Sequence, residues 1–195
     1  MASARIIGVL LAAGAGSRFG GGKLEALLGG MMIGEYAARA LAACQCDWHA
    51  AVCGQDGNTL VSMLESQGFA RIENASTSAG LSHSLALGAR HATHCDADAM
   101  LVCLGDMPFV TTDHLDRLIA TFASADGQAC IASQNGQTRM PPAIFPKSRF
   151  PQLMALTGDQ GARLLLRDAI GVPTDPGLLA DIDTQGDLAG LKATP

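Results

Sequence analysis

The sequence has few aromatic residues, no long hydrophobic run and no excess of basic charge. Aromatic side chains make up 4% of the 195 residues, so the core must be built mainly from alanine, leucine, valine and isoleucine. The net charge of −5 argues against a general nucleic-acid-binding protein, which should carry a basic face. No apolar run approaches the roughly 20 residues that span a bilayer. We therefore expect a cytoplasmic protein with small-molecule substrates and neither nucleic-acid nor membrane partners.

Six cysteines are present, and their spacing does not change this expectation. Cys53 and Cys103 fall inside apolar runs, where cysteine usually acts as a small hydrophobe. Cys44 and Cys46 have the wrong spacing for a zinc or thioredoxin motif. Two histidines, a cysteine and an aspartate in residues 91–98 favour a polar helix end over a metal cluster, because no second ligand pair follows at zinc-site spacing.

The most informative segment is a glycine-rich loop that follows an apolar run near the N-terminus. Ile6–Leu11 is typical of a buried strand, and residues 12–23 then contain five glycines, Arg18 and Lys23. Glycines let backbone N–H groups approach a ligand closely, because no Cβ stands in the way. No acidic residue precedes Glu25, so both cations are expected to be available to a ligand. This combination favours binding of a polyphosphate.

Two common phosphate-binding loops do not fit this spacing. A P-loop requires Ser or Thr after its lysine, where Leu24 stands, and a glycine where Ser17 stands. A Rossmann fingerprint requires a third glycine at the position of Phe19. The mismatch argues against both an ATPase-type loop and a dinucleotide oxidoreductase.

The loop instead resembles the signature of the nucleoside-triphosphate transferases, Leu-Ala-Ala-Gly-x-Gly-x-Arg-x-Gly followed shortly by lysine. Leu11–Gly20 and Lys23 satisfy it throughout. The chain is similar, from about Ile6 to Leu191, to the branch that includes the molybdenum cofactor cytidylyltransferases and their guanylyl relatives. Four further blocks support the resemblance: Gly80–Leu85, Gly105–Pro108, Gly158–Arg163 and Asp181–Thr184.

The resemblance implies a magnesium-dependent nucleotidyltransferase that joins CMP from CTP to molybdopterin and releases pyrophosphate. Ala13 stands where guanylyl relatives carry glycine, which favours cytosine. The same chemistry with another nucleotide, or with a sugar or polyol phosphate as acceptor, stays open. A non-catalytic nucleotide-binding protein that serves a molybdoenzyme or its chaperone also stays open, although intact Arg18, Lys23 and Asp106 count against it. Pro141 replaces a histidine usual in relatives, which leaves the identity of the acceptor open.

The alternation of apolar runs with helical patterns predicts a three-layer α/β/α domain with a mostly parallel, Rossmann-like sheet. The length suits one domain over residues 1–195, with a nucleotide-binding part over about 1–125 and an acceptor-binding extension over about 126–195. In the extension we expect an extended run over 141–145, a helix around 162–169 and a short helix after Thr184. The expected strands of the first part are Ile6–Leu11, His49–Cys53, Ala70–Glu73, Ala99–Leu104 and Gln128–Ala132, and the expected helices cover residues 33–44, 81–92 and 115–122.

Asp106 is the best candidate for a metal ligand, because it follows the apolar run Ala99–Leu104 after a single glycine. Ligands of open α/β sheets bind outside the carboxyl ends of the strands. Magnesium prefers one or two carboxylates together with phosphate oxygens and waters. The resemblance implies Asp183 as a second ligand, but Asp183 could instead cap the helix after Thr184.

The remaining site residues follow from the resemblance. Arg18, Lys23 and Asp106 would be catalytic, and Gly80 and Ser84 would contact the base, whereas Ser82 is expected to be only a helix N-cap. The acceptor would lie near Arg139, Asp159 and Arg163, of which Asp159 is also a good N-cap. The expected nucleotide-binding residues are Leu11, Ala12, Ala13, Gly14, Gly16, Ser17, Arg18, Lys23, Gly80, Ser84 and Asp106.

Overall fold

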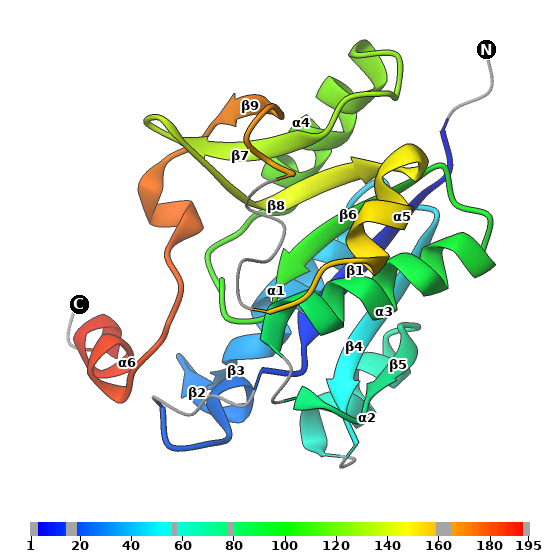
Figure 1. Cartoon of the computed structure of the whole chain (residues 1–195). Coiled ribbons are helices and arrows are strands. Elements are labelled where there is room, and N and C mark those ends of the chain that lie inside the picture. The colour runs from blue at the N-terminus through cyan, green and yellow to red at the C-terminus, as the bar shows by residue number, and fades with distance from the viewer. Residues whose placement is uncertain (1–3, 15–18, 56–57, 78–79, 159–164, 193–195) are drawn as a thin grey trace.

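A seven-stranded sheet with helices on both faces forms the centre of the molecule (Figure 1). The computed structural model describes residues 4–14, 19–55, 58–77, 80–158 and 165–192. Along the sheet the strand order is β5-β4-β1-β6-β8-β7-β9. The bounds are Ile6–Ala12 (β1), Trp48–Gly54 (β4), Ala70–Asn74 (β5), Ala99–Leu104 (β6), Ile131–Asn135 (β7), Thr138–Pro146 (β8) and Ile170–Pro173 (β9).

The two central strands fix the position of the candidate site. β1 pairs in parallel with both β4 and β6, so that Leu10 lies opposite Ala51 on one side and Cys103 on the other. The chain continues from β1 to β4 and β5 in one direction, and then crosses back to place β6 on the other side of β1. Among the described strands of this sheet, β8 alone runs antiparallel to its neighbours, so the predicted mostly parallel α/β fold is confirmed. Ligands of such sheets bind where the strand order reverses, which here is between β1 and β6.

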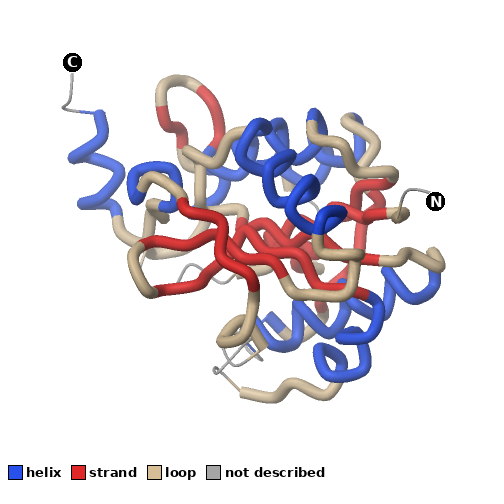
Figure 2. The backbone as a smooth tube through the Cα atoms, turned by 90° about the horizontal axis from the view of Figure 1, so that it is seen from above, coloured by secondary structure: helices blue, strands red, loops and turns tan. Residues whose placement is uncertain are grey.

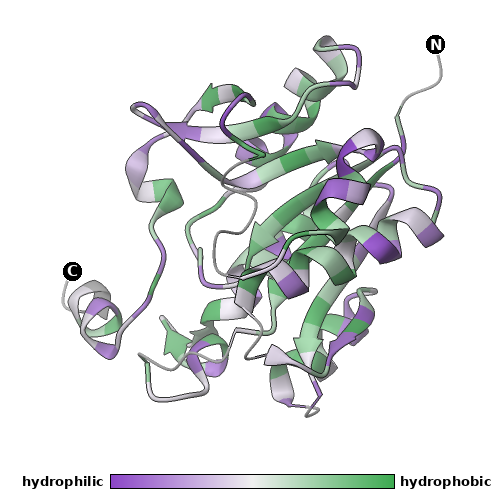
Figure 3. Cartoon of the chain, in the orientation of Figure 1, coloured by the Kyte–Doolittle hydropathy of each residue, from purple (hydrophilic) through white to green (hydrophobic). Residues whose placement is uncertain are grey.

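Side chains of β1 alternate between two apolar layers, as the period of two residues in a strand requires. Ile6 and Leu10 face the layer formed with α1 (Ile33–Ala43), α2 (Thr59–Ser66) and α4 (Thr112–Ser124). Ile7, Val9 and Leu11 face α3 (Gly80–His94) and α5 (Phe150–Met154). Seen along the sheet, the helices lie on either side of it (Figure 2). The central strands are coloured mostly as hydrophobic, whereas hydrophobic and hydrophilic residues alternate along the helices (Figure 3).

The C-terminal arm returns to the carboxyl edge of the sheet. Ile182 donates its backbone N–H to the carbonyl of Asp106 at 3.0 Å. Ile182 and Leu188 pack with Phe19 and Ile33 in a small separate core. The last helix, α6 (Gln185–Lys192), contacts the short hairpin formed by β2 (Leu27–Leu28) and β3 (Met31–Met32). This arm thereby carries the Asp181–Thr184 segment to the end of β6.

Several sequence expectations need correction. Residues 165–169 form turns, so the helix expected around 162–169 is wrong in its described part. β7 begins at Ile131, three residues after the expected start, and β8 begins at Thr138, before the proline pair. The structure adds α2, α5, β2, β3 and β9, which were not expected. No helix in the described ranges is long and apolar enough to cross a membrane.

Candidate nucleotide-binding site

A cleft of about 290 Å³ lies at the carboxyl ends of β1 and β6. Its volume is near the lower end of the roughly 300–1,000 Å³ typical of small-molecule sites. Segments from four parts of the chain meet there, and the side walls are largely apolar. The described lining residues are Leu11, Ala13, Gly14, Lys23, Leu24, Thr77, Gly80, Leu81, Ser84, Leu104 and Asp106.

The end of β6 is held tightly against the end of β1. Gly105 donates its backbone N–H to the Leu11 carbonyl at 3.0 Å. A Cβ at Gly105 would lie only 3.2 Å from that oxygen and 3.1 Å from Leu24 Cδ1. A side chain at this position would therefore push the strand ends apart. Glycine at 105 explains how Asp106 is placed next to the loop that follows β1.

Lys23 joins two carboxylates that are far apart in the sequence. Its Nζ donates to Asp106 Oδ2 at 2.7 Å and to Asp183 Oδ1 at 2.9 Å. The Lys23 side chain is 12% exposed. Burial alone would lower the pKa of Lys23, but the two hydrogen bonds to carboxylates outweigh it and the pKa lies above its usual value. The absence of an acidic residue before Glu25 therefore does not leave Lys23 unpaired, because its partners come from the end of β6 and from the C-terminal arm.

The helix cap that was considered for Asp183 is supplied by Thr184. Thr184 Oγ1 accepts from the backbone N–H of Asp187 at 3.1 Å, and Asp187 Oδ2 accepts from the backbone N–H of Thr184 at 2.7 Å. This reciprocal pair is a capping box at the start of α6. The Asp183 carboxylate accepts instead from Lys23. Burial, followed by the negative charge of Asp183, raises the pKa of neighbouring Asp181.

The start of α3 forms the opposite wall of the cleft. Gly80 has a φ of +79°, a conformation that glycine adopts without strain. Ser84 is buried, and its Oγ accepts from Asn74 Nδ2 at 3.1 Å, which leaves the hydroxyl hydrogen for another acceptor. Ser82 is not the N-cap, because α3 already begins at Gly80. The Ser82 hydroxyl donates to the carbonyl of Gly158 and so ties α3 to the segment after α5.

The remaining predicted site residues either lie away from the cleft or fall outside the described residues. Arg139 is not one of the described residues that line the cleft, and its Nη1 donates to the Arg167 carbonyl at 3.1 Å. Ala12 closes β1 but does not line the cleft either. Gly16, Ser17, Arg18, Asp159 and Arg163 lie outside the described residues.

Sequence analysis did not identify Leu24, Thr77, Leu81, Leu104 or Asn74 as site residues. Asn74 offered a usable signal, since it is a polar residue at the carboxyl end of a strand, as Asp106 is. The three leucines carried no such signal, because the sequence does not distinguish a leucine that lines a cleft from one in the core.

Comparisons with known proteins identify the family and the fold. Residues 8–173 match the MobA-like NTP transferase domain. The chain is 31% identical to the purine catabolism protein PucB of Bacillus subtilis (strain 168), over 94% of each protein. The manganese complex of Rv0371c from Mycobacterium tuberculosis H37Rv aligns with a TM-score of 0.75, at 22% identity, over 98% of this chain and 100% of that one. Molybdopterin-guanine dinucleotide biosynthesis protein A from Archaeoglobus fulgidus aligns with a TM-score of 0.70, at 19% identity, over 95% and 96%.

Proposed function

The chain belongs to the MobA-like NTP transferase domain family, and from this premise we propose that it transfers CMP from CTP to molybdopterin in a magnesium-dependent reaction that releases pyrophosphate. The observation that carries the proposal is the ion-pair cluster in the cleft, where the Lys23 ammonium lies between the carboxylates of Asp106 and Asp183. A nucleotidyltransferase must neutralise two anionic reactants and hold them in line. The proposed setting of this reaction is the cytoplasm.

The donor set at this point suits magnesium. Asp106 and Asp183 would supply two carboxylates, and the cleft leaves the remaining positions for phosphate oxygens and waters, as magnesium prefers. When bound there, the cation would neutralise charge on the reacting phosphates. The manganese in the Rv0371c structure is in keeping with a divalent cation in this fold. Lys23 would then turn its ammonium from the carboxylates to the triphosphate.

The walls of the cleft provide the remaining binding functions. The backbone at Ala13 and Gly14 would face the nucleotide together with Gly16, Ser17 and Arg18 of the same loop. Gly80 and Ser84 would contact the base from the start of α3, where free helical N–H groups favour polar ligands. Residues beyond about 126 would form the acceptor side of the site, with Arg139, Asp159 and Arg163 as the proposed acceptor contacts.

Cytosine is the proposed base because Ala13 places a methyl group where guanylyl relatives have glycine. Ala13 is 5% exposed and also belongs to the apolar layer beneath α3, so its methyl group is held in place. Ser84 would add a hydrogen bond that a poorly seated purine leaves unmade, and an unpaired buried polar group costs about 1–3 kcal/mol.

Pyrophosphate release from each of the four NTPs, with magnesium and with or without molybdopterin, tests the proposal. CTP with molybdopterin should exceed GTP at least tenfold in kcat/KM, since about 1.4 kcal/mol corresponds to a factor of ten. Pyrophosphate release that requires a sugar or polyol phosphate would refute molybdopterin as the acceptor, but it would still support nucleotidyl transfer. NTP binding without turnover on any acceptor would favour an accessory protein for a molybdoenzyme.

A further inference from the structure

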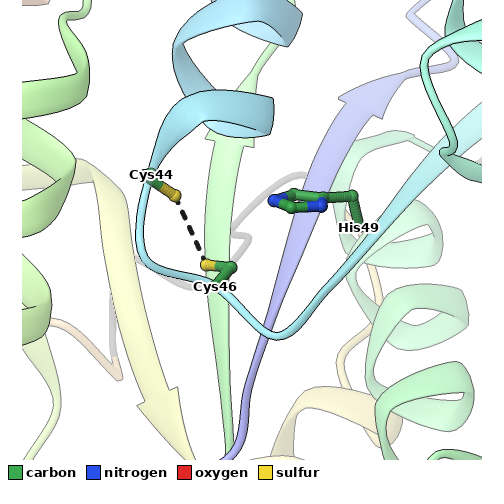
Figure 4. A group of neighbouring side chains, drawn as sticks. All are labelled: Cys44, Cys46 and His49. Carbon is green, nitrogen blue, oxygen red and sulfur yellow. Dashed lines mark hydrogen bonds between the residues drawn. The ribbon is translucent and has the colours of Figure 1, made fainter.

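We propose that Cys44, Cys46 and His49 form a zinc-binding site at the amino edge of the sheet. Their ligand atoms all lie within 4.8 Å of one another. Figure 4 shows the imidazole ring of His49 pointing toward the two sulfur atoms. The Cys-x-Cys spacing does not itself predict this site, because the third ligand reaches it only after the chain has turned into β4.

The distance between the two sulfur atoms is close to the one that zinc requires. The Sγ atoms of Cys44 and Cys46 are 3.5 Å apart. With Zn–S bonds of about 2.3 Å and tetrahedral angles, two thiolates would be about 3.8 Å apart. The two sulfur atoms therefore need to separate by only about 0.3 Å to accept the ion between them.

The loop that carries the thiols is held by backbone hydrogen bonds. Cys46 donates its N–H to the Cys44 carbonyl at 2.8 Å, and Asp47 donates its N–H to the Ile6 carbonyl at 2.8 Å. Gln45 donates its N–H to Asp116 Oδ1 at 2.9 Å, and Asp47 Oδ2 accepts from the N–H of Ile6 at 2.7 Å. Ligand positions fixed in advance reduce the ordering cost of binding a metal.

His49 has a buried nitrogen that the protein leaves without a partner. Among the described residues, Nε2 of His49 makes no hydrogen bond although it is shielded from solvent. The ring is fixed against Phe69, with centroids 5.5 Å apart. A Cβ at Gly8 on the adjacent strand would lie 3.3 Å from His49 Cδ2, so glycine leaves room for the ring. A buried polar atom without a partner is costly, and a metal ion would satisfy it.

The chemistry of the three ligands selects a thiophilic ion. Thiolates favour zinc over magnesium, and imidazole also suits zinc. Two thiolates neutralise the charge of Zn²⁺, so the filled site would be electrically neutral in a half-buried place. Cys46 and His49 are partly exposed, and a water molecule would serve as the fourth ligand.

This site is separate from the nucleotide cleft. Cys44 follows α1 and His49 lies at the start of β4, whose first residues pair with the start of β1. The cleft lies at the opposite ends of β1 and β6. A zinc ion would join the end of α1 to the start of β4, so its effect should be on stability and not on the cleft.

The test is a titration of the reduced full-length protein with Co²⁺, which reports zinc sites through its absorption, followed by displacement with Zn²⁺. Charge-transfer bands from thiolate to Co²⁺ should appear, saturate at one equivalent and vanish when Zn²⁺ is added. Carboxylate ligands in the nucleotide cleft cannot produce such bands. Zinc should also raise the melting temperature of the wild type, because the assembled site would bind the ion more tightly than the unfolded chain does.

Variants identify the ligands. Cys44→Ser, Cys46→Ser and His49→Gln should each weaken Co²⁺ binding by at least the roughly 10–100-fold that loss of an outer-shell partner costs. Cys95→Ser is the matched control, because Cys95 also lies beside a histidine, with its Sγ 3.6 Å from His91 Nε2, and should bind as the wild type does. His49→Gln keeps the test valid if a cysteine variant fails to fold. Absence of thiolate bands in the wild type, or equal loss of binding in Cys95→Ser, would overturn the proposal.

Discussion

Replacing Lys23 by methionine should raise the affinity of the cleft for Mn²⁺ but lower the rate of nucleotidyl transfer. The Lys23 ammonium neutralises Asp106 and Asp183 at 2.7 and 2.9 Å, so a divalent cation must compete with it for these carboxylates. Methionine keeps much of the apolar stem and removes the charge. Without nucleotide, Lys23→Met should therefore bind Mn²⁺ more tightly, whereas nucleotidyl transfer should slow because the triphosphate has lost a cationic partner.

The size of the effect follows from the exposure of the three side chains. The carboxylates of Asp106 and Asp183 are 23% and 44% exposed, so solvent screens their attraction to Lys23. Such a pair contributes at most about 1 kcal/mol. Loss of both pairs should raise the affinity for Mn²⁺ roughly tenfold, since 1.4 kcal/mol is a factor of ten. The free energy of unfolding without metal should fall by about 1 kcal/mol.

Free Mn²⁺ measured by electron paramagnetic resonance gives the affinity, and pyrophosphate release gives the transfer rate. Lys147→Met is the matched control, because Lys147 is also paired with an aspartate, Asp96, but lies away from the cleft. The control should change neither quantity. If Lys23→Met bound Mn²⁺ no better than the wild type, Asp106 and Asp183 would not be the carboxylates that hold the metal.

Three further substitutions test other parts of the account. Asp106→Asn should fold normally and lose on the order of 10²-fold or more in turnover, comparable to loss of one preorganised electrostatic group. Asp183→Asn should lose less. Turnover of Asp106→Asn equal to that of the wild type at saturating magnesium would contradict the role of Asp106. Ala13→Gly should narrow the preference for CTP over GTP in kcat/KM, and an unchanged ratio would mean that the methyl group does not read the base. Burial, followed by the charge of Arg117, lowers the pKa of His114 from 6.5 to about 4, so the unfolded chain takes up a proton first as pH falls. The free energy of unfolding should therefore drop by about 2 kcal/mol between pH 7 and pH 5, and denaturant titrations of His114→Gln should lack that drop.

The parts of the site that follow a strand could be predicted from the sequence. The glycine loop after Ile6–Leu11 and the position of Asp106 after Ala99–Leu104 are local patterns, and parallel strands bring their carboxyl ends to one edge. The contact between Lys23 and Asp183 joins residues 160 positions apart. It depends on the path of the C-terminal arm, which no local pattern encodes.

Other differences have equally specific causes. α2 is only eight residues long, too short for its Leu60, Val61 and Leu64 to establish a helical period. The turn between α1 and β4 is what brings His49 close to Cys44 and Cys46. Ser82 suits an N-cap by residue type, but the helix already begins at Gly80, whose φ is +79°.

Metal-dependent nucleotidyl transfer in the cleft is tested most sharply by a crystal structure with Mn²⁺ and a CTP analogue that cannot be cleaved between the α- and β-phosphates. We expect anomalous density for Mn²⁺ between the carboxylates of Asp106 and Asp183, with the phosphates beside Gly14 and Lys23 and the base against the start of α3. A metal bound elsewhere, or a nucleotide outside the cleft between β1 and β6, would contradict it.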